Sequence, residues 1–140
     1  MAEDPPIPAV LAFLLCDQIV TEAQTNKKSI IGMFDRMLVA TLPAIHPQPI
    51  WIYVKLADGE GEYVYRIEII KLDSGQAIGR IDTHPTQIKS RLESTDIVLK
   101  IPPMAIEELG VYEFQLFANN IWIGRTMMNV VQVPPGGPQS

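Results

Sequence analysis

Few side chains in this sequence combine the types and the spacing that catalysis or metal binding requires. The 140 residues include one cysteine, Cys16, and two histidines, His46 and His84. Cys16 lies in an apolar run where a thiolate is poorly stabilised, so we expect a structural cysteine. Each histidine precedes a proline, as in surface loops, and the three residues are too far apart to form a metal-ligand motif. The sequence therefore predicts no nucleophile–base pair, no catalytic residue and no cofactor.

The densest group of potential cation ligands is the acidic segment 58–62. Carboxylates gathered on a flexible loop suit Ca²⁺, which makes Asp58, Glu60 and Glu62 weak candidates for a calcium or ligand site. Asp58-Gly59 favours a hairpin turn, and an acidic hairpin tip also protects a sheet from edge pairing without binding anything. We expect Glu68 and Glu113, in alternating strands, to face water, which leaves no carboxylate pair for glycoside chemistry.

Short β-rich runs separated by turn residues position these side chains, and helical periodicity is almost absent. We expect about eight strands, over residues 9–23, 29–42 with a bend at 35–36, 50–56, 62–72, 76–82, 97–101, 111–118 and 121–133. Only residues 104–110 favour a helical turn. Strands without interposed helices predict an all-β, antiparallel β-sandwich. We expect one domain over 9–133, with a flexible segment 1–8 and a disordered Pro/Gly tail 134–140.

The segment Leu109-Gly110-Val111-Tyr112 has the form of a tyrosine corner, in which a tyrosine that opens a late strand hydrogen-bonds back to the preceding loop. In an antibody domain the second disulfide cysteine would stand two residues later, where this chain has Phe114. The motif therefore predicts an immunoglobulin-like topology without a disulfide.

Three segments resemble a bacterial family of small β-sandwich proteins known only as a domain of unknown function. They are Leu15-Cys16-Asp17, the isoleucine-glycine segment 29–34, and a G-x-Y-x-F-x-L segment over 110–116. The resemblance extends from about residue 11 to residue 133. It supports the sandwich fold and implies no active site.

Composition excludes several classes of partner. The net charge is −5, and the 11 basic residues are scattered among 16 acidic ones, so no basic patch for nucleic acid or an anionic membrane is expected. A single cysteine cannot form an internal disulfide, which fits a reducing compartment. The apolar run 9–16 is too short to span a membrane, and the preceding residues are acidic where a signal peptide is basic. We therefore expect a cytoplasmic protein without membrane insertion.

Apolar surface in excess of what a sandwich core needs is the remaining signal. Alternation places Trp51 and Tyr53 on an outer face, and the last strand is apolar on both faces, with Trp122 and Met128 on one of them. Trp, Tyr and Met are enriched at protein interfaces, although loops or termini could cover these strands instead. We expect a non-enzymatic module that binds a protein partner or itself as a homo-oligomer through Trp51, Tyr53, Trp122 and Met128. The alternatives are a calcium- or ligand-binding domain that uses the segment 58–62, and an enzyme with a site built from loops 43–49 and 82–95.

Overall fold

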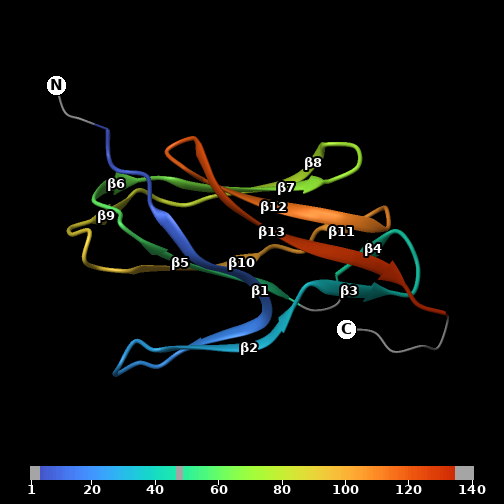
Figure 1. The fold of residues 1–140 in the computed structure, drawn as a ribbon. Coiled ribbons are helices and arrows are strands. Elements are labelled where there is room, and N and C mark those ends of the chain that lie inside the picture. The colour runs from blue at the N-terminus through green and yellow to red at the C-terminus, as the bar shows by residue number, and fades with distance from the viewer. Residues whose placement is uncertain (1–3, 47–48, 135–140) are drawn as a thin grey trace.

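The computed structural model describes residues 4–46 and 49–134. Within these ranges the chain forms thirteen strands and no helix. Nine strands form two facing sheets (Figure 1), and the other four form two small sheets. The expected all-β sandwich without a disulfide is confirmed, and Cys16 is a buried free cysteine. The expected count of about eight strands is too low, because short bridging strands lie in stretches that read as loops.

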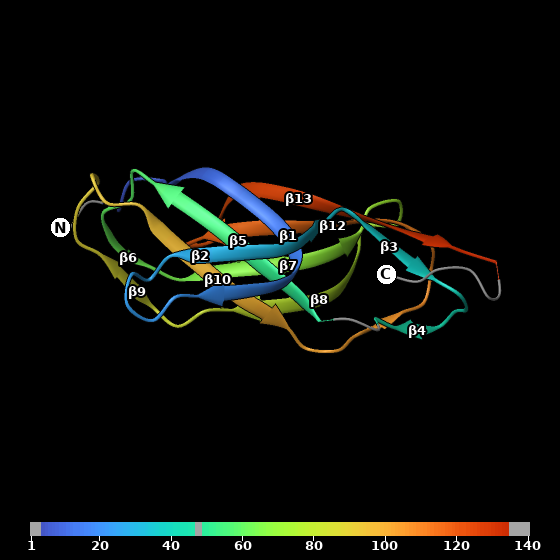
Figure 2. The same ribbon diagram turned by 90° about the horizontal axis from the view of Figure 1, so that it is seen from below.

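The first layer is a four-stranded antiparallel sheet, nearest the viewer in Figure 2. In spatial order its strands are β10 (Thr95–Ile101), β5 (Ile50–Ala57), β1 (Ala9–Thr21) and β2 (Lys28–Phe34). Strict alternation in β5 explains its orientation, since every second residue from Ile50 to Leu56 is at most 1 % exposed. These apolar side chains point into the core.

The second layer is a five-stranded sheet. In spatial order its strands are β3 (Arg36–Val39), β13 (Ile121–Gln132), β12 (Gly110–Ala118), β7 (Tyr65–Lys71) and β8 (Gln76–Asp82). Its pairs are antiparallel except β13 with β3, which run parallel. The expected bend at 35–36 therefore separates two strands, β2 and β3, that belong to different sheets.

Two small two-stranded sheets close the ends of the sandwich. One pairs β4 (Ala44–Ile45) with β11 (Ala105–Ile106), and the other pairs β6 (Gly61–Tyr63) with β9 (Thr86–Ile88). The helical turn expected at 104–110 is wrong, because these residues pair with β4 and then enter the tyrosine corner. Asp58 has the expected positive φ of 62°. The segment 58–62 is nevertheless not a hairpin tip, since it crosses from the four-stranded sheet to β6.

The tyrosine corner is present. The Tyr112 hydroxyl donates a hydrogen bond to the Glu108 carbonyl oxygen at 2.7 Å, and Phe114 is fully buried where an antibody domain has its cysteine. This is the feature on which the immunoglobulin-like expectation was based.

Both ends of the chain lie partly outside the described ranges. Residues 1–3 and 135–140 lie outside the described ranges, and with them most of the expected tail. Residues 4–8, however, pack on the domain: Pro8 is buried, and the Pro6 carbonyl oxygen accepts a 2.6 Å hydrogen bond from the Tyr63 hydroxyl. Pro6 and Pro8 thus contact the domain, and the flexibility expected of segment 1–8 stays a prediction.

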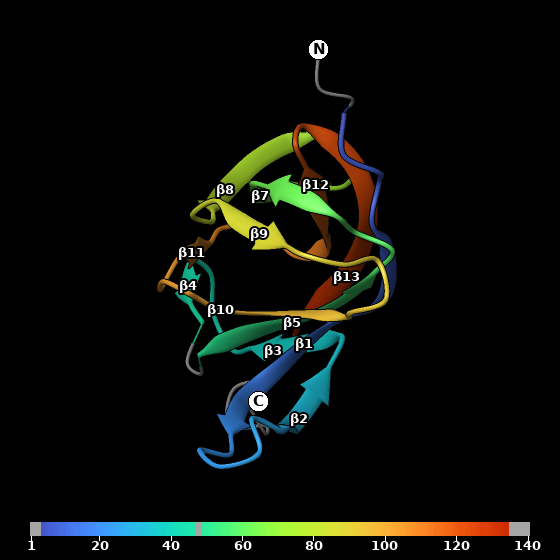
Figure 3. The ribbon, with the colours of Figure 1, turned by 90° about the vertical axis from the view of Figure 1, so that its left-hand side faces the viewer.

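The β1–β2 hairpin projects from the sandwich. Pairing of β1 with β5 ends at Cys16–Trp51, whereas pairing of β1 with β2 continues to Thr21–Lys28. Figures 1 and 3 show this part of the hairpin below the two layers. We call residues 17–33 the arm.

Candidate functional site

Trp51 and Tyr53 lie on the outer face of the four-stranded sheet, as expected, and both are partly buried. The Lys100 ammonium lies 5.7 Å from the Trp51 ring centroid. The Tyr53 hydroxyl donates a 2.7 Å hydrogen bond to an Asp96 carboxylate oxygen. Burial raises the pKa of Tyr53 to about 12, and the hydrogen bond and charge of Asp96 act in the same direction. Both aromatic residues are thus held by neighbours on β10.

The prediction that Trp122 and Met128 share this surface is wrong. Met128 is fully buried in the core, and Trp122, 54 % exposed, lies on the other sheet. The physical reason is a bulge: Leu116 pairs with Gly124 and Phe117 with Trp122, so Ile123 is an extra residue. A bulge reverses the alternation beyond it. Met128 therefore points inward and Trp122 outward.

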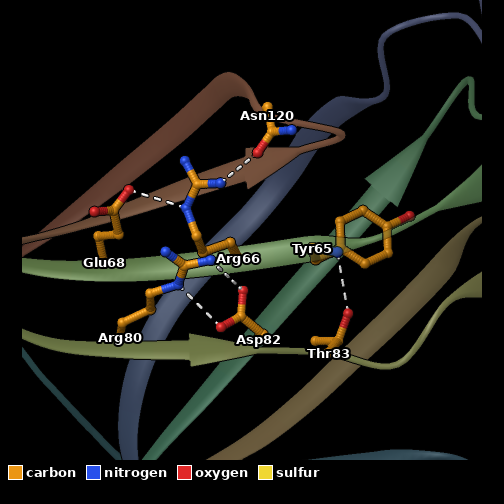
Figure 4. Close-up of polar contacts among 7 residues, drawn as sticks. All are labelled: Tyr65, Arg66, Glu68, Arg80, Asp82, Thr83 and Asn120. Carbon is orange, nitrogen blue, oxygen red and sulfur yellow. Dashed lines mark hydrogen bonds and ion pairs between the residues drawn. The ribbon is translucent and has the colours of Figure 1, made fainter.

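The face around Trp122 combines paired polar side chains with exposed apolar ones. Arg66 stacks 4.2 Å above the Phe117 ring, donates to Glu68 at 3.0 Å and reaches Asn120 at 2.6 Å. Figure 4 shows the contacts of Arg66 with Glu68 and Asn120 beside the ion pair of Arg80 and Asp82 on β8. These side chains satisfy one another, whereas Trp122 and Met127 on the same face remain 54 % and 42 % exposed.

Glu113 belongs to the same outer face but is only 2 % exposed, which corrects the expectation that it faces water. Its carboxylate accepts hydrogen bonds from Gln115 at 2.8 Å and from Arg125 at 3.1 Å. A buried carboxylate needs such partners, and these two supply them. Glu113 is accordingly a structural ion-pair residue.

Cys16 lies between Trp51 and Met33 in one row across the four-stranded sheet. It has no exposed surface, and its thiol is 3.8 Å from the Trp51 carbonyl oxygen. Burial raises the pKa of the thiol, and the charge of Asp17 raises it further. The protonated thiol is favoured, in agreement with a structural role.

The remaining chemical candidates do not converge. Asp58, Glu60 and Glu62 are exposed, and within residues 4–46 and 49–134 no three Asp, Glu, His or Cys side chains come together as possible metal ligands. His84 is exposed, as expected of a surface loop. His46 is buried instead, where its Nε2 lies 3.3 Å from the Pro102 carbonyl oxygen and 3.2 Å from the Met104 amide nitrogen.

The arm carries exposed apolar residues that the sequence did not single out as a surface. Met33 is 68 %, Ile31 48 % and Val20 42 % exposed. The pairs Cys16–Met33, Gln18–Ile31 and Val20–Ser29 place all three on one face of the hairpin, continuous with Trp51. The sequence carried a signal for this surface, because it predicted that β1 is apolar on both faces. It did not show which part of β1 extends beyond the sandwich.

Three surface grooves meet where β2 turns into β3. One of about 130 Å³ includes Met33, Phe34 and Arg36, and its walls are mainly apolar. A second shares Met33 and Phe34 with it, and a third continues from Asp35 over Met127. Residues 33–36 therefore contribute to three neighbouring grooves.

Comparison with known proteins gives a family but no activity. A model of a family described as a family of unknown function, DUF6941, matches residues 11–131. The chain belongs to this family. No curated protein matches the sequence. Among solved structures, an immunoglobulin-like protein from Pseudomonas aeruginosa is similar at 11 % identity, over 90 % of this chain and 98 % of that chain, with a TM-score of 0.37.

Two of the segments on which the family resemblance was based face each other in this DUF6941 chain. Asp17 and Gly32 occupy facing positions between the pairs Cys16–Met33 and Gln18–Ile31. Gly32 has a φ of 67°, and a side chain at this position would collide with the Asp17 carboxyl group. Both line the 130 Å³ groove. The two motifs thus build the base of the arm.

None of the described ranges contains a helix long and apolar enough to cross a membrane.

Proposed function

We propose that this protein is a non-enzymatic interaction module that self-associates, with the arm as its contact surface. The observation that carries the proposal is the exposure of Met33, Ile31 and Val20 on one face of a projecting hairpin. Exposed, contiguous apolar side chains mark interaction sites, and methionine adapts to irregular partner surfaces.

A second copy of the chain is the occupant, because the charges at the two ends of β2 complement each other. Lys27 and Lys28 stand at its start, and Asp35 follows its last residue. An antiparallel arrangement of two such strands brings the basic end of one to the acidic end of the other. Opposite charges across an interface fix its register and its partner.

The sequence predicted that Trp51 and Tyr53 belong to the contact surface, and we propose a different role for them. They are held by Lys100 and Asp96, so we assign them to the support of the sheet that bears the arm. Trp122 lies on the opposite sheet and is outside the proposed surface.

We further propose a cytoplasmic setting. The support is the free Cys16 thiol, which fits a reducing compartment. No reaction is assigned to the protein.

Sedimentation equilibrium tests the proposal. The wild-type protein is expected to change from one copy to two between about 1 and 100 µM, a usual range for a weak homodimer. Met33→Lys puts a charge in the contact and is expected to raise the dissociation constant at least ~10-fold. Leu92→Lys is the matched control, since Leu92 is 97 % exposed and lies in a loop outside the arm. A wild-type protein that stays monomeric over this range contradicts the proposal.

A further inference from the structure

The edge of β2 is chemically different from the other free edges of the two larger sheets. Those sheets end in β10 and β2, and in β3 and β8, among the residues that the structure describes. Natural proteins protect free edges with charged side chains or keep them short. The other three follow this rule: β10 carries Asp96 and Lys100, β8 carries Arg80 and Asp82, and β3 has four residues and starts with Arg36. From Ser29 to Phe34, β2 carries no charge.

We propose that β2 pairs antiparallel with β2 of a second copy, centred on Ile31, so that the two four-stranded sheets form one continuous sheet. This inference is based on the self-association proposed above and adds its geometry. Ile31 is the middle residue of β2. A two-fold axis at this position pairs the full length of both strands, with Ile31 opposite Ile31 and Ser29 opposite Met33.

Pairing in this register leaves no like charges opposite each other. Lys28 of one copy faces Phe34 of the other. One step further, Lys27 faces the second copy's Asp35, and the two-fold axis repeats this contact. Neither side chain forms an ion pair with another residue in the described part of the chain, so both remain available. Directly opposite charges stabilise a strand pair and like charges destabilise it.

The same register gathers the exposed apolar side chains. Val20 pairs with Ser29 within each arm, so the row of Val20 and Ser29 continues into the second copy's Met33. The next row contains Ile31 from both copies. Three neighbouring rows therefore bring together Val20, Ile31 and Met33 of both chains on one face. A register shifted by one residue would place the apolar side chains of the two copies on opposite faces of the joined sheet.

The arm makes this edge accessible. Beyond Cys16, β1 has no β5 partner, and the hairpin lies clear of the two layers (Figure 3). The proposed contact therefore lies mainly on the projecting arms and not on the two layers. Gly32 has a positive φ, but the β1–β2 register is the same on both of its sides, so the strand remains usable as an edge.

Cross-linking tests the centre of the register. Opposite residues in an antiparallel pair have Cβ atoms about 4.5–5.5 Å apart, close enough for a disulfide to form with little movement. Oxidised Ile31→Cys is expected to give a covalent dimer. Val98→Cys, in the middle of the charged edge strand β10, is expected to give no covalent dimer. Cys16 is buried, so the wild type is expected to give no covalent dimer.

Charge reversal tests the ends of the register. Lys27→Asp and Asp35→Lys should each raise the dissociation constant roughly 10-fold, since each places like charges at two symmetric positions. The double variant restores the pairs and should return to the wild-type constant. Lys89→Asp and Asp58→Lys are exposed controls of matched charge and should have no effect.

The outcomes separate the two proposals. A wild-type dimer in which Ile31→Cys does not cross-link, or in which the double charge variant does not recover, overturns the β2 pairing and leaves self-association intact. A wild-type monomer overturns both. A cross-link together with charge rescue supports both.

Discussion

Tyr112 and Tyr65 are both core residues, but their hydroxyl groups have different surroundings. The Tyr112 hydroxyl donates to the Glu108 carbonyl oxygen at 2.7 Å. The Tyr65 hydroxyl is buried without a hydrogen-bond partner among the residues that the structure describes, and burial raises its pKa to about 12. The same chemical change at these two positions therefore removes a hydrogen bond in one case and none in the other.

We expect Tyr112→Phe to lower the free energy of unfolding by about 1 kcal/mol, the usual net contribution of one hydrogen bond. Tyr65→Phe removes a hydroxyl that is costly to bury unpaired, so its free energy of unfolding should equal or exceed that of the wild type. Urea denaturation monitored by circular dichroism measures both. An equal decrease in the free energy of unfolding of the two variants would show that the hydrogen bond of the tyrosine corner contributes nothing specific to stability.

Lys71 is a lysine whose side chain is only 4 % exposed at the end of the core, and its ammonium is 2.8 Å from the Asp73 carboxylate. The hydrogen bond between them raises the pKa of Lys71 above 10.5 and lowers the pKa of Asp73 below 3.8. The stability that Asp73 contributes is fully present at pH values above its ordinary pKa of 3.8. It is lost as the pH falls through the lower pKa that Asp73 has in the folded state. The stability that Lys71 contributes is lost only as the pH rises through the raised pKa of Lys71 in the folded state.

Asp73→Asn should therefore be less stable than the wild type at neutral pH, and the two unfolding curves should converge in acid below the folded-state pKa of Asp73. Urea denaturation at a series of pH values measures the difference. Asp58→Asn, which forms no ion pair within the described ranges, is the control. A difference that persists unchanged in strong acid would contradict the assigned pair.

At the scale of the elements, the arm is shaped by the contact of Gly32 with Asp17. Gly32 has a φ of 67°, a region that only glycine adopts without cost. The Asp17 carboxyl group occupies the space that a side chain at 32 would need. Backbone conformation and packing thus impose the same requirement at this position.

We expect Gly32→Ala to lower the free energy of unfolding by about 2–3 kcal/mol, from backbone strain plus the collision with Asp17. Gly75→Ala is the matched control, because Gly75 has a φ of 71° with no atom within 4 Å of the added methyl group. Its loss should be about 1 kcal/mol. In the double variant with Asp17→Ala, the loss should fall to that of the control. Chemical denaturation of the two single variants and the double variant measures these losses of unfolding free energy.

The faces of strand residues were predicted correctly from the sequence except where a bulge interrupts the strand. In β5 the alternation is unbroken, and the faces of Trp51 and Tyr53 were predicted correctly. In β13 an extra residue, Ile123, reverses the alternation, so that Met128 was assigned to the wrong face. Nothing in the residue types around Ile123 marks the bulge, because it is defined by the pairing with β12.

At the scale of the whole molecule, the sandwich followed from the strand pattern but the arm did not. Hydrophobic alternation and turn residues predicted most strands and the tyrosine corner. Which strands pair depends on long-range packing. The sequence alone therefore did not show that the pairing of β1 with β5 ends at Cys16–Trp51 while the pairing of β1 with β2 continues to Thr21. The exposed faces of Ile31 and Met33 arise from this difference in length.

The distribution of charge over the sheet margins also limits how far an assembly can grow. A chain with two unprotected margins could add copies at both ends and form a fibre. This chain has a single long uncharged margin between Ser29 and Phe34, among the margins of its two larger described sheets. When two copies join there, the margins that remain are charged or short. In the proposed pairing, growth therefore ends at two copies, and we expect the protein to stay a discrete particle at high concentration.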